Sequence, residues 1–358
     1  MLVIRPIYSF THSPIYSFLH SIIYSFNMAL KPHNFSLPFN IQRCSHVHCT
    51  VKDLAASRRF YVDIMGFIET ERTKDTIYLR GLEEKNHHCY VLQQGEKAEV
   101  LALGFKVGFD KDLDALALHF KSLNLPAKWV KRHGEERTLA VSTPLGLPLE
   151  FHAKQTRVPT LMRDYIHYKG LAPLRFDHIN CFTPNCQTTY EFMIEQLGFR
   201  LTEYTLTEKG DMWAAWTHRK GNVHDMALTN GRGPRLHHTG IWTASINNII
   251  HLLDVMASQG YVENIERGPG RHGISNAFFL YILDPDGHRL EPFTCDYLTI
   301  DNDWEPLSWD LRDPRRQTLW GAPAPKSWFE HGSTFRGVEV RDSDIDSNPI
   351  VAGYEDVA

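Results

Sequence analysis

Residues 60–71 read "FYVDIMGFIETE" and residues 192–203 read "FMIEQLGFRLTE", two similar stretches that lie 132 positions apart. The same shift brings "SHVHC" (45–49) onto "DHINC" (177–181) and aligns His46 with His178. Similarity at a fixed spacing indicates an internal repeat of one structural unit. We therefore expect two similar domains, over residues 41–155 and 172–300, joined by a polar linker over residues 156–171.

Each half divides again into two shorter units. In the second half, "LRFDHINCFT" (174–183) lines up with "PRLHHTGIWT" (234–243), and both have the alternating pattern of a strand. A stretch with apolar residues at three- and four-residue intervals follows each of them, which predicts a helix. Strand-like segments come next, and the last of them contains the turn "DPDG". The unit is predicted to be β-α-β-β-β, present four times, in an α+β fold of two barrel-like domains.

The composition is that of a soluble globular protein. Hydrophobic residues make up 42% and charged residues 22% of the 358, and the formal net charge of −4 gives no reason to expect nucleic-acid binding. No apolar run approaches the roughly 18 residues needed to cross a membrane. The six cysteines are scattered and form no CxxC pair, which favours free thiols in the cytoplasm over a disulfide framework.

The two ends of the chain carry weaker signals. Before the first acidic residue, Asp53, the chain repeats "IYSF" at 7–10, 15–18 and 23–26, a pattern that fits neither a secretory signal nor an arginine-rich presequence. We expect residues 1–40 to be a disordered or non-native extension, with Met28 as the working start. Residues 301–358 are predicted to cover part of the substrate pocket, and the acidic tail after about residue 335 either covers its mouth or is disordered.

Two of the 20 histidines fall at matching places in the repeat. His178 and His238 occupy the same position in two copies of one strand, whereas His237 aligns with Asp177. Adjacent residues of a strand point to opposite faces of the sheet. The repeat therefore selects His238 as the residue that faces the cavity, and it leaves His237 pointing outward or supporting His238 from behind.

A carboxylate on the closing hairpin is the third candidate. If residues 284–288 form the connection, Leu283 lies opposite Arg289 and Tyr281 lies opposite Glu291, on one face. A four-residue connection would place Glu291 opposite Leu280 instead. In the first register, two imidazoles and one carboxylate converge in the facial arrangement that suits Fe(II) oxygen chemistry. A structural role for each histidine, and a surface position for Glu291, remain the alternatives at this point.

Several long motifs carry a family resemblance: "FDHIN", "AAWTHRKGNVHDMALT", "GPRLHHTGIWT", "IERGPGRHGISNAFFLYILDPDGHRLE" and "RRQTLWG". Over residues 41 to about 330 the chain resembles the type I extradiol ring-cleavage dioxygenases of the vicinal oxygen chelate superfamily. Within them it is most similar to the group that cleaves homoprotocatechuate (3,4-dihydroxyphenylacetate). The resemblance implies a four-module fold, two modules per domain, that opens a catechol ring with O₂ to a muconic semialdehyde.

The resemblance also assigns roles to individual residues. It implies Fe(II), with Mn(II) as the alternative, held by His178, His238 and Glu291 in the C-terminal domain. It implies a catalytic set of His224, His272 and Tyr281, with His224 as the acid–base residue. It implies substrate contacts from Asn180, Trp216, Arg267 and Arg316. Homo-oligomers, with a tetramer favoured, are the expected assembly.

Two departures from the family pattern limit what it predicts. Gln317 stands where the closest relatives have the second of two arginines, which leaves open whether the substrate is 3,4-dihydroxyphenylacetate or a catechol with another side chain. In the first half, His46 and Glu150 match His178 and Glu291, but Ala102 falls on the His238 position. We therefore expect no metal in residues 41–155. A metal-dependent glyoxalase-like isomerase and a non-catalytic small-molecule binding protein are the competing functions on this fold.

Overall fold

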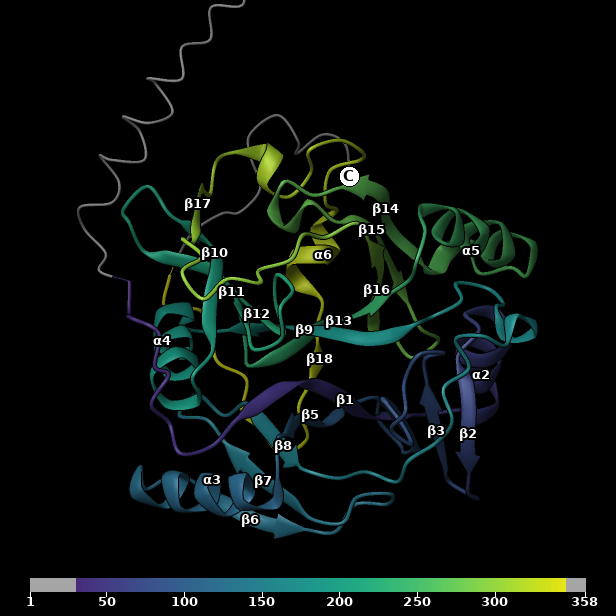
Figure 1. Cartoon of the computed structure of the whole chain (residues 1–358). Helices are drawn as coiled ribbons and strands as arrows, with labels where there is room; N and C mark the ends of the chain where they lie inside the picture. The colour runs from purple at the N-terminus through teal and green to yellow at the C-terminus, as the bar shows by residue number, and fades with distance from the viewer. Residues whose placement is uncertain (1–29, 346–358) are drawn as a thin grey trace, which may run out of the picture.

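The computed structural model describes residues 30–345, so the predicted start at Met28 and the stretch before it lie outside the described residues. Two halves lie against each other, with the N-terminal half in blue below the C-terminal half in green (Figure 1). Each half contains two copies of one β-α-β-β-β module, which confirms the predicted α+β fold.

The N-terminal half forms one 8-stranded sheet in the order β2-β3-β4-β1-β5-β8-β7-β6. Its first module contains β1 (Ile41–Val51), α2 (Leu54–Arg58), the π-helical turn η1 (Arg59–Ile64), β2 (Ile68–Arg72), β3 (Thr76–Arg80) and β4 (Tyr90–Gln94). Its second contains β5 (Val100–Val107), α3 (Asp110–Ser122), β6 (Ala127–Val130), β7 (Thr138–Ser142) and β8 (Pro148–His152). The two modules meet where β1 and β5 pair antiparallel.

The C-terminal half follows a short 3₁₀ turn, η2 (Tyr165–His167), and repeats this plan in a 10-stranded sheet. Its first module contains β9 (Arg175–Thr183), α4 (Cys186–Leu197), β10 (Arg200–Leu206), β11 (Met212–His218) and β12 (Met226–Asn230). Its second contains β13 (Arg235–Trp242), α5 (Ile246–Ser258), η3 (Val262–Asn264), β14 (Ile265–Arg271), η4 (Ile274–Asn276), β15 (Phe278–Leu283) and β16 (Arg289–Thr294). The central strands β9 and β13 pair antiparallel, so each module supplies one of them.

Local sequence explains where these helices begin and end. In α5, Ile249, Leu252 and Met256 recur at three- and four-residue spacing and are fully buried, so one face of the helix packs on the sheet. The Ser245 hydroxyl accepts a hydrogen bond from the Asn247 amide and caps the first turn. At the end of α4, Gly198 adopts the left-handed conformation that commonly terminates a helix.

The strand pairing identifies which residues of the two halves correspond to each other. Val47 of β1 lies beside Tyr90 of β4, as Ile179 of β9 lies beside Met226 of β12. Gly104 of β5 lies beside Glu150 of β8, as Gly240 of β13 lies beside Glu291 of β16. Counting from these pairs, the N-terminal half has His46, His88, Ala102 and Glu150 at the positions of His178, His224, His238 and Glu291.

The closing hairpin has the register that the five-residue connection predicts. Leu283 lies opposite Arg289, and Phe279 lies opposite Phe293. These two pairs flank Tyr281 and Glu291 and set them opposite each other on one face of the hairpin.

The segment after β16 returns across the C-terminal half. β17 (Leu307–Asp310) adds to the sheet beside β10, and β18 (Ser333–Thr334) pairs with β13. Between them lie the 3₁₀ turn η5 (Pro314–Arg316) and the short helix α6 (Lys326–Glu330), which Figure 1 shows in yellow-green near β13 and β16. Among the described residues, no helix is long and apolar enough to cross a membrane.

Candidate metal centre

Three neighbouring strands bring His178, His238 and Glu291 together. His178 lies on β9, His238 on β13 and Glu291 on β16, and Gly240 of β13 pairs with both His178 and Glu291. A Cβ added at Gly240 would lie 2.1 Å from Cε1 of His178. The glycine therefore leaves the space that the His178 ring fills beside the Glu291 side chain.

The donor atoms of these three residues surround one point. Nε2 of His178 is 3.3 Å from Nε2 of His238 and 2.9 Å from Oε2 of Glu291, and His238 Nε2 is 3.0 Å from the same oxygen. Two ligands at right angles, each about 2.1 Å from an ion, are about 3.0 Å apart. The three donors therefore fit a divalent cation bound on one face, with its remaining positions directed into the pocket.

The charges around the three residues favour a cation. Burial opposes protonation of His178, but hydrogen bonds and charges from Asp177 and Glu291 outweigh it and raise its pKa to about 9. Burial lowers the pKa of His238 to about 4 despite the Glu291 charge. Burial alone would raise the pKa of Glu291, yet the hydrogen bonds from the two imidazoles hold it well below its ordinary value. At neutral pH and without a metal, Glu291 is therefore ionised and His178 is protonated on both ring nitrogens.

The residue before each histidine supports that histidine from behind. Asp177 Oδ1 lies 3.5 Å from Nδ1 of His178, and His237 Nδ1 lies 2.6 Å from Nδ1 of His238. His237 Nε2 is 2.8 Å from the Trp328 carbonyl, which can only accept, so that nitrogen donates. Its Nδ1 must then accept from His238, which leaves the lone pair of His238 Nε2 free for a metal.

His237 lies outside the pocket lining, as both readings made from the sequence expected. Its side chain is not exposed to solvent, because it is fully buried between Phe182, His238 and Trp328. The contact with His238 fits a residue that supports His238 from behind.

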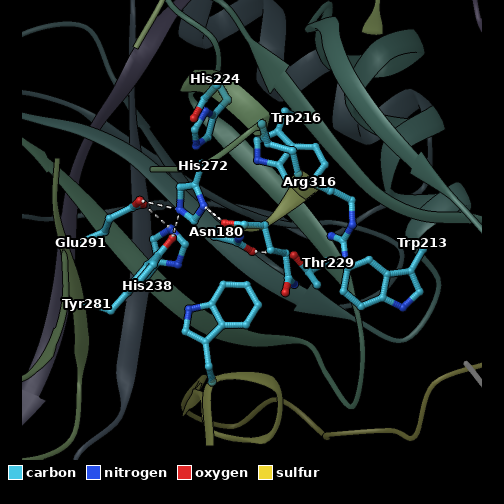
Figure 2. Close-up of a pocket in the computed structure, with 14 residues that line it drawn as sticks. Asn180, Trp213, Trp216, His224, Thr229, His238, His272, Tyr281, Glu291 and Arg316 are labelled. Carbon is cyan, nitrogen blue, oxygen red and sulfur yellow. Dashed lines mark hydrogen bonds and ion pairs between the residues drawn. The ribbon is translucent and has the colours of Figure 1, made fainter. Parts of the chain in front are cut away.

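A pocket opens beside the three donors, and Figure 2 shows its lining. Eight of the ten residues predicted for the site line this pocket: Asn180, Trp216, His224, His238, His272, Tyr281, Glu291 and Arg316. His178 lies directly behind this lining, with its Nε2 against Glu291 and His238. Arg267 is outside the lining.

His272 and Tyr281 form a hydrogen-bonded pair at the edge of the triad. The Gln317 carbonyl contacts Nδ1 of His272 and so requires a proton there, which makes Nε2 of the neutral ring an acceptor. The Tyr281 hydroxyl lies 3.0 Å from that Nε2 and donates to it. The His272 ring stacks on Phe279 with 3.8 Å between centroids, which fixes its plane. Burial lowers the pKa of His272 and raises that of Tyr281, so both are neutral near pH 7.

His224 approaches the triad from the other side. Its ring centroid is 4.0 Å from that of His178, and its Nδ1 is buried with no hydrogen-bond partner among the described residues. Burial, together with the positive charge on His178, holds the pKa of His224 well below its ordinary value. The side chain is therefore a neutral imidazole with an unused nitrogen.

The two predicted arginines differ in their access to the pocket. Arg316 lines it, with its guanidinium carbon 5.0 Å from the centre of the Trp213 ring and its Nε without a hydrogen-bond partner. Burial, and then the charge of Arg267, lower the pKa of Arg316 to about 9. Arg267 donates to the Gln317 carbonyl and to Oγ1 of Thr318, and it packs against aromatic rings behind Tyr281.

Five residues that were not predicted from the sequence also line the pocket: Trp213, Thr229, Ile274, Ser275 and Trp328. Trp213 is three positions before Trp216 on β11, a spacing that strand alternation assigns to opposite faces, so alternation gave no signal for it. Trp328 comes from α6, far along the chain and outside the repeat, and no pattern linked it to the site.

The N-terminal half does not reproduce the triad. Ala102 occupies the place of His238 and offers no donor. Glu150 has both oxygens engaged by the guanidinium of Arg132, with Nε of Arg132 2.8 Å from Oε2. Of the three N-terminal residues at the triad positions, only His46 could still act as a metal ligand.

Comparison with known proteins agrees with this geometry. The Glyoxalase/Bleomycin resistance protein/Dioxygenase superfamily matches residues 43–145 and 175–291. An extradiol ring-cleaving dioxygenase from B. fuscum superposes with a TM-score of 0.84 and 40% identity, over 88% of this chain and 90% of that one. Homoprotocatechuate 2,3-dioxygenase from Brevibacterium fuscum, in an anaerobic complex with 3,4-dihydroxyphenylacetate, gives a TM-score of 0.82 and 40% identity, over 87% and 99%.

A curated relative is named for the metal on which it depends. The manganese-dependent 2,3-dihydroxybiphenyl 1,2-dioxygenase of Geobacillus genomosp. 3 is 30% identical over 80% of this chain and 95% of its own length. The chain thus belongs to the Glyoxalase/Bleomycin resistance protein/Dioxygenase superfamily and, within it, to the extradiol catechol dioxygenases, which are oxidoreductases.

Proposed function

We propose that the protein opens the ring of a catechol beside one hydroxyl, with O₂, at a non-haem Fe(II) ion held by His178, His238 and Glu291. The observation that carries the proposal is the set of donor separations, 2.9 to 3.3 Å, at the wall of a pocket. A manganese-dependent relative makes Mn(II) the alternative ion. When bound, such an ion would hold both catechol oxygens and O₂ side by side and lower the pKa of the hydroxyls.

Proton transfer falls to His224 in this proposal. Ring opening requires a base that takes a hydroxyl proton and later returns it, and an imidazole suits both steps. His224 lines the pocket as a neutral imidazole able to take the proton, and its lowered pKa favours the later return.

His272 and Tyr281 serve to orient the bound substrate. The Tyr281 hydroxyl donates to His272 in the free protein, and it can turn to an oxygen atom bound at the triad instead. Asn180 and Trp216 line the pocket wall and support the ring face and edge. Because the pocket is lined by Trp213, Trp216 and Trp328, it excludes water from the reacting ring.

3,4-Dihydroxyphenylacetate is the first choice of substrate. Its side-chain carboxylate matches the positive charge of Arg316, which lines the pocket and has an unused Nε. Arg267 stays a predicted contact that would need to leave its place among the rings to reach the substrate. Gln317 adds a buried, unpartnered amide Nε2 that can donate one neutral hydrogen bond to the same carboxylate.

The activity is tested by reconstituting the purified protein anaerobically with Fe(II), then with Mn(II), and adding a catechol and O₂. We expect a yellow ring-fission product, and none from a Glu291→Gln protein prepared in the same way. A glyoxalase-like isomerase or a binding protein would bind metal or ligand and consume no O₂, and that outcome would refute the proposal.

The substrate is tested by comparing 3,4-dihydroxyphenylacetate with 4-methylcatechol. Loss of a charge-assisted hydrogen bond costs about 1.5–3 kcal/mol, so Arg316→Gln should raise KM about 10- to 100-fold for the carboxylated catechol alone. Arg315→Gln is the matched control, since the Arg315 side chain is 71% exposed and paired with Asp313. Equal effects of Arg316→Gln on both catechols would contradict the assignment.

We further infer a homo-oligomer, with a tetramer favoured, that works in the cytoplasm. The buried free thiols of Cys44, Cys49, Cys89, Cys181 and Cys186 support a reducing compartment. Light scattering of the purified protein tests the assembly, and a monomer would refute it.

A further inference from the structure

A second cluster of potential metal ligands lies inside the N-terminal half. His46 of β1, His88 before β4 and Glu135 after β6 each offer one donor atom, and these atoms lie within 4.8 Å of one another. The Glu135 side chain is 0% exposed, and the His46 side chain is 3% exposed. His152, at the end of β8, adds a third imidazole that is fully buried.

The carboxylate of Glu135 is the centre of this cluster. Its Oε1 lies 3.7 Å from Nδ1 of His46 and 3.7 Å from Nδ1 of His152. Tetrahedral ligands with bonds of about 2.0–2.1 Å are about 3.4 Å apart, so these two separations are a few tenths of an ångström longer than those around a bound ion. The nearest arginine, Arg132, is already paired with Glu150. Glu135 is therefore a buried carboxylate that lies beside two imidazoles and accepts hydrogen bonds from Thr138 and Gln155.

The hydrogen bonds of the cluster show which lone pairs an ion would have to take over. The Gln155 carbonyl oxygen accepts from the His88 amide, which turns the Gln155 amide nitrogen toward Nε2 of His88 and Oε1 of Glu135, 3.2 Å from each. Nε2 of His88 is then an acceptor, and a metal bound there would displace the Gln155 amide, just as one on Nδ1 of His46 would displace the Ser45 hydroxyl, 3.1 Å away. Nδ1 of His152 is buried and has no hydrogen-bond partner among the described residues. A buried nitrogen without a partner is costly unless something fills its site.

The match between the halves shows how the cluster differs from the triad. His46 and His88 stand at the positions of His178 and His224, and His152 stands at that of Phe293. The ring centroids of His46 and His152 are 5.5 Å apart, and those of His178 and Phe293 are 4.8 Å apart. Beside the shared histidine, the N-terminal half therefore has an imidazole where the C-terminal half has a phenyl ring, and an alanine where the C-terminal half has a histidine.

We propose that the N-terminal half binds a second divalent transition-metal ion, of the Zn²⁺ class, through His46, His88 and Glu135, with His152 as a fourth donor. Imidazole nitrogens and a carboxylate oxygen are zinc ligands, and a closed, buried set of four protein donors with no open position is the arrangement of a structural rather than a catalytic centre. The ion would neutralise Glu135 and use the free nitrogen of His152. The site is separate from the ring-cleavage centre and does not depend on the function proposed for that centre.

A neighbouring group of residues provides the matched control. Glu71, His87 and His133 also have donor atoms within 4.8 Å of one another, but the Glu71 and His133 side chains are 40% and 48% exposed. His87 Nε2 and His133 Nε2 lie 3.1 and 2.9 Å from Glu71 Oε2, as in an ordinary surface ion-pair group. The outer group contacts the inner one through His87 and His88, whose Nδ1 atoms are 3.1 Å apart. Changes to the outer group should therefore leave the inner ion in place.

The test uses the full chain with the ring-cleavage centre disabled by His178→Ala and Glu291→Gln. The protein is incubated with Zn²⁺, passed through a chelating resin, and its zinc content is measured by mass spectrometry. We expect about one zinc ion per chain, as for a closed structural site. Adding Glu135→Gln or His88→Gln should abolish retention, whereas adding His133→Ala should not.

Three outcomes would overturn the proposal: no retained zinc, retention unaffected by both Glu135→Gln and His88→Gln, or loss of retention on His133→Ala. Circular dichroism of each metal-free variant checks that it has folded. Because a buried substitution can prevent folding, Co²⁺ is also added to the centre-disabled chain that carries neither cluster substitution. Intense visible bands of tetrahedral Co²⁺ are expected, and weak octahedral bands would refute the site.

Discussion

The two halves of the molecule keep one histidine at the same place and give it opposite properties. His178 lies between Asp177 and Glu291, and despite burial these carboxylates raise its pKa to about 9. His46 has Ser45 in place of Asp177, and burial, with positive charges from His48, Arg132 and Arg43, lowers its pKa to about 3. The comparison teaches that the fold supplies the position of the ring, whereas the neighbouring carboxylates supply its chemistry.

The largest expected difference between the halves concerns the paired glutamates. Glu291→Gln should remove bound metal and reduce ring cleavage by more than the roughly 10,000-fold upper figure for losing an acid–base group. Glu150→Gln should leave both unchanged, because Arg132 engages both Glu150 oxygens. Metal analysis and oxygen uptake measure the two effects. If Glu150→Gln reduced activity as strongly, the two halves would not be functionally distinct.

A substitution at His224 should separate metal binding from the chemical step, and its effect should be the next largest. We expect His224→Asn to lower kcat about 10²- to 10⁴-fold, the usual contribution of a general acid–base residue. Its metal content should stay at the level of the unchanged protein, since the His224 ring packs on His178 and no donor atom of the triad is lost. Single-turnover kinetics with metal analysis measure both, and unchanged turnover would remove His224 from the mechanism.

The support behind His238 should matter less than the ligand itself. His237→Ala removes the acceptor for His238 Nδ1, and loss of such a partner typically weakens metal binding about 10- to 100-fold. Leu101 stands at the matching place before Ala102, so Leu101→Ala should leave the affinity for the catalytic ion unchanged. Competition with a chelator gives both affinities. Equal affinity in the His237→Ala protein would mean that the contact does not orient the ring.

The smallest effect is the pH dependence of metal binding. His178 holds a proton below about pH 9 in the metal-free protein, and a metal must displace that proton. Apparent affinity should therefore rise about tenfold per pH unit from pH 6.5 to 8.5 and level off above pH 9. About one proton should be released for each ion bound at pH 7. Isothermal titration in buffers of different ionisation enthalpy counts these protons, and zero release would contradict the raised pKa.

The sequence predicted those parts of the molecule that repetition and alternation govern. The spacing of "SHVHC" and "DHINC" predicted two halves of two modules each, and the structure has them. The five-residue connection predicted Leu283 opposite Arg289, which is the observed pair. The family resemblance then predicted which side chains converge, and the donor atoms of His178, His238 and Glu291 are all within 3.3 Å of one another.

Contacts made by loops and by the segment after β16 could not be predicted from repetition, strand alternation or the family resemblance. Trp328 reaches the pocket only because α6 folds back over β13, and no local pattern fixes such a long-range contact. Arg132 and Glu135 lie in the connection between β6 and β7, which corresponds to the connection between β14 and β15 and shares "RHG" (132–134 and 271–273) with it, but Glu135 falls on Ile274. Their pairing with Glu150 and with the inner histidines depends on three-dimensional packing, which alignment of the halves does not contain.

Gly104 and Gly240 carry a consequence for recognising this arrangement in other sequences. An added methyl group would lie 2.2 Å from the His46 ring at Gly104 and 2.1 Å from the His178 ring at Gly240. The N-terminal half has Ala102 in place of the second histidine and a glutamate paired with Arg132, yet it keeps the space that the first imidazole fills. In a relative known only from its sequence, a glycine two positions after a missing histidine would therefore predict an imidazole on the neighbouring strand.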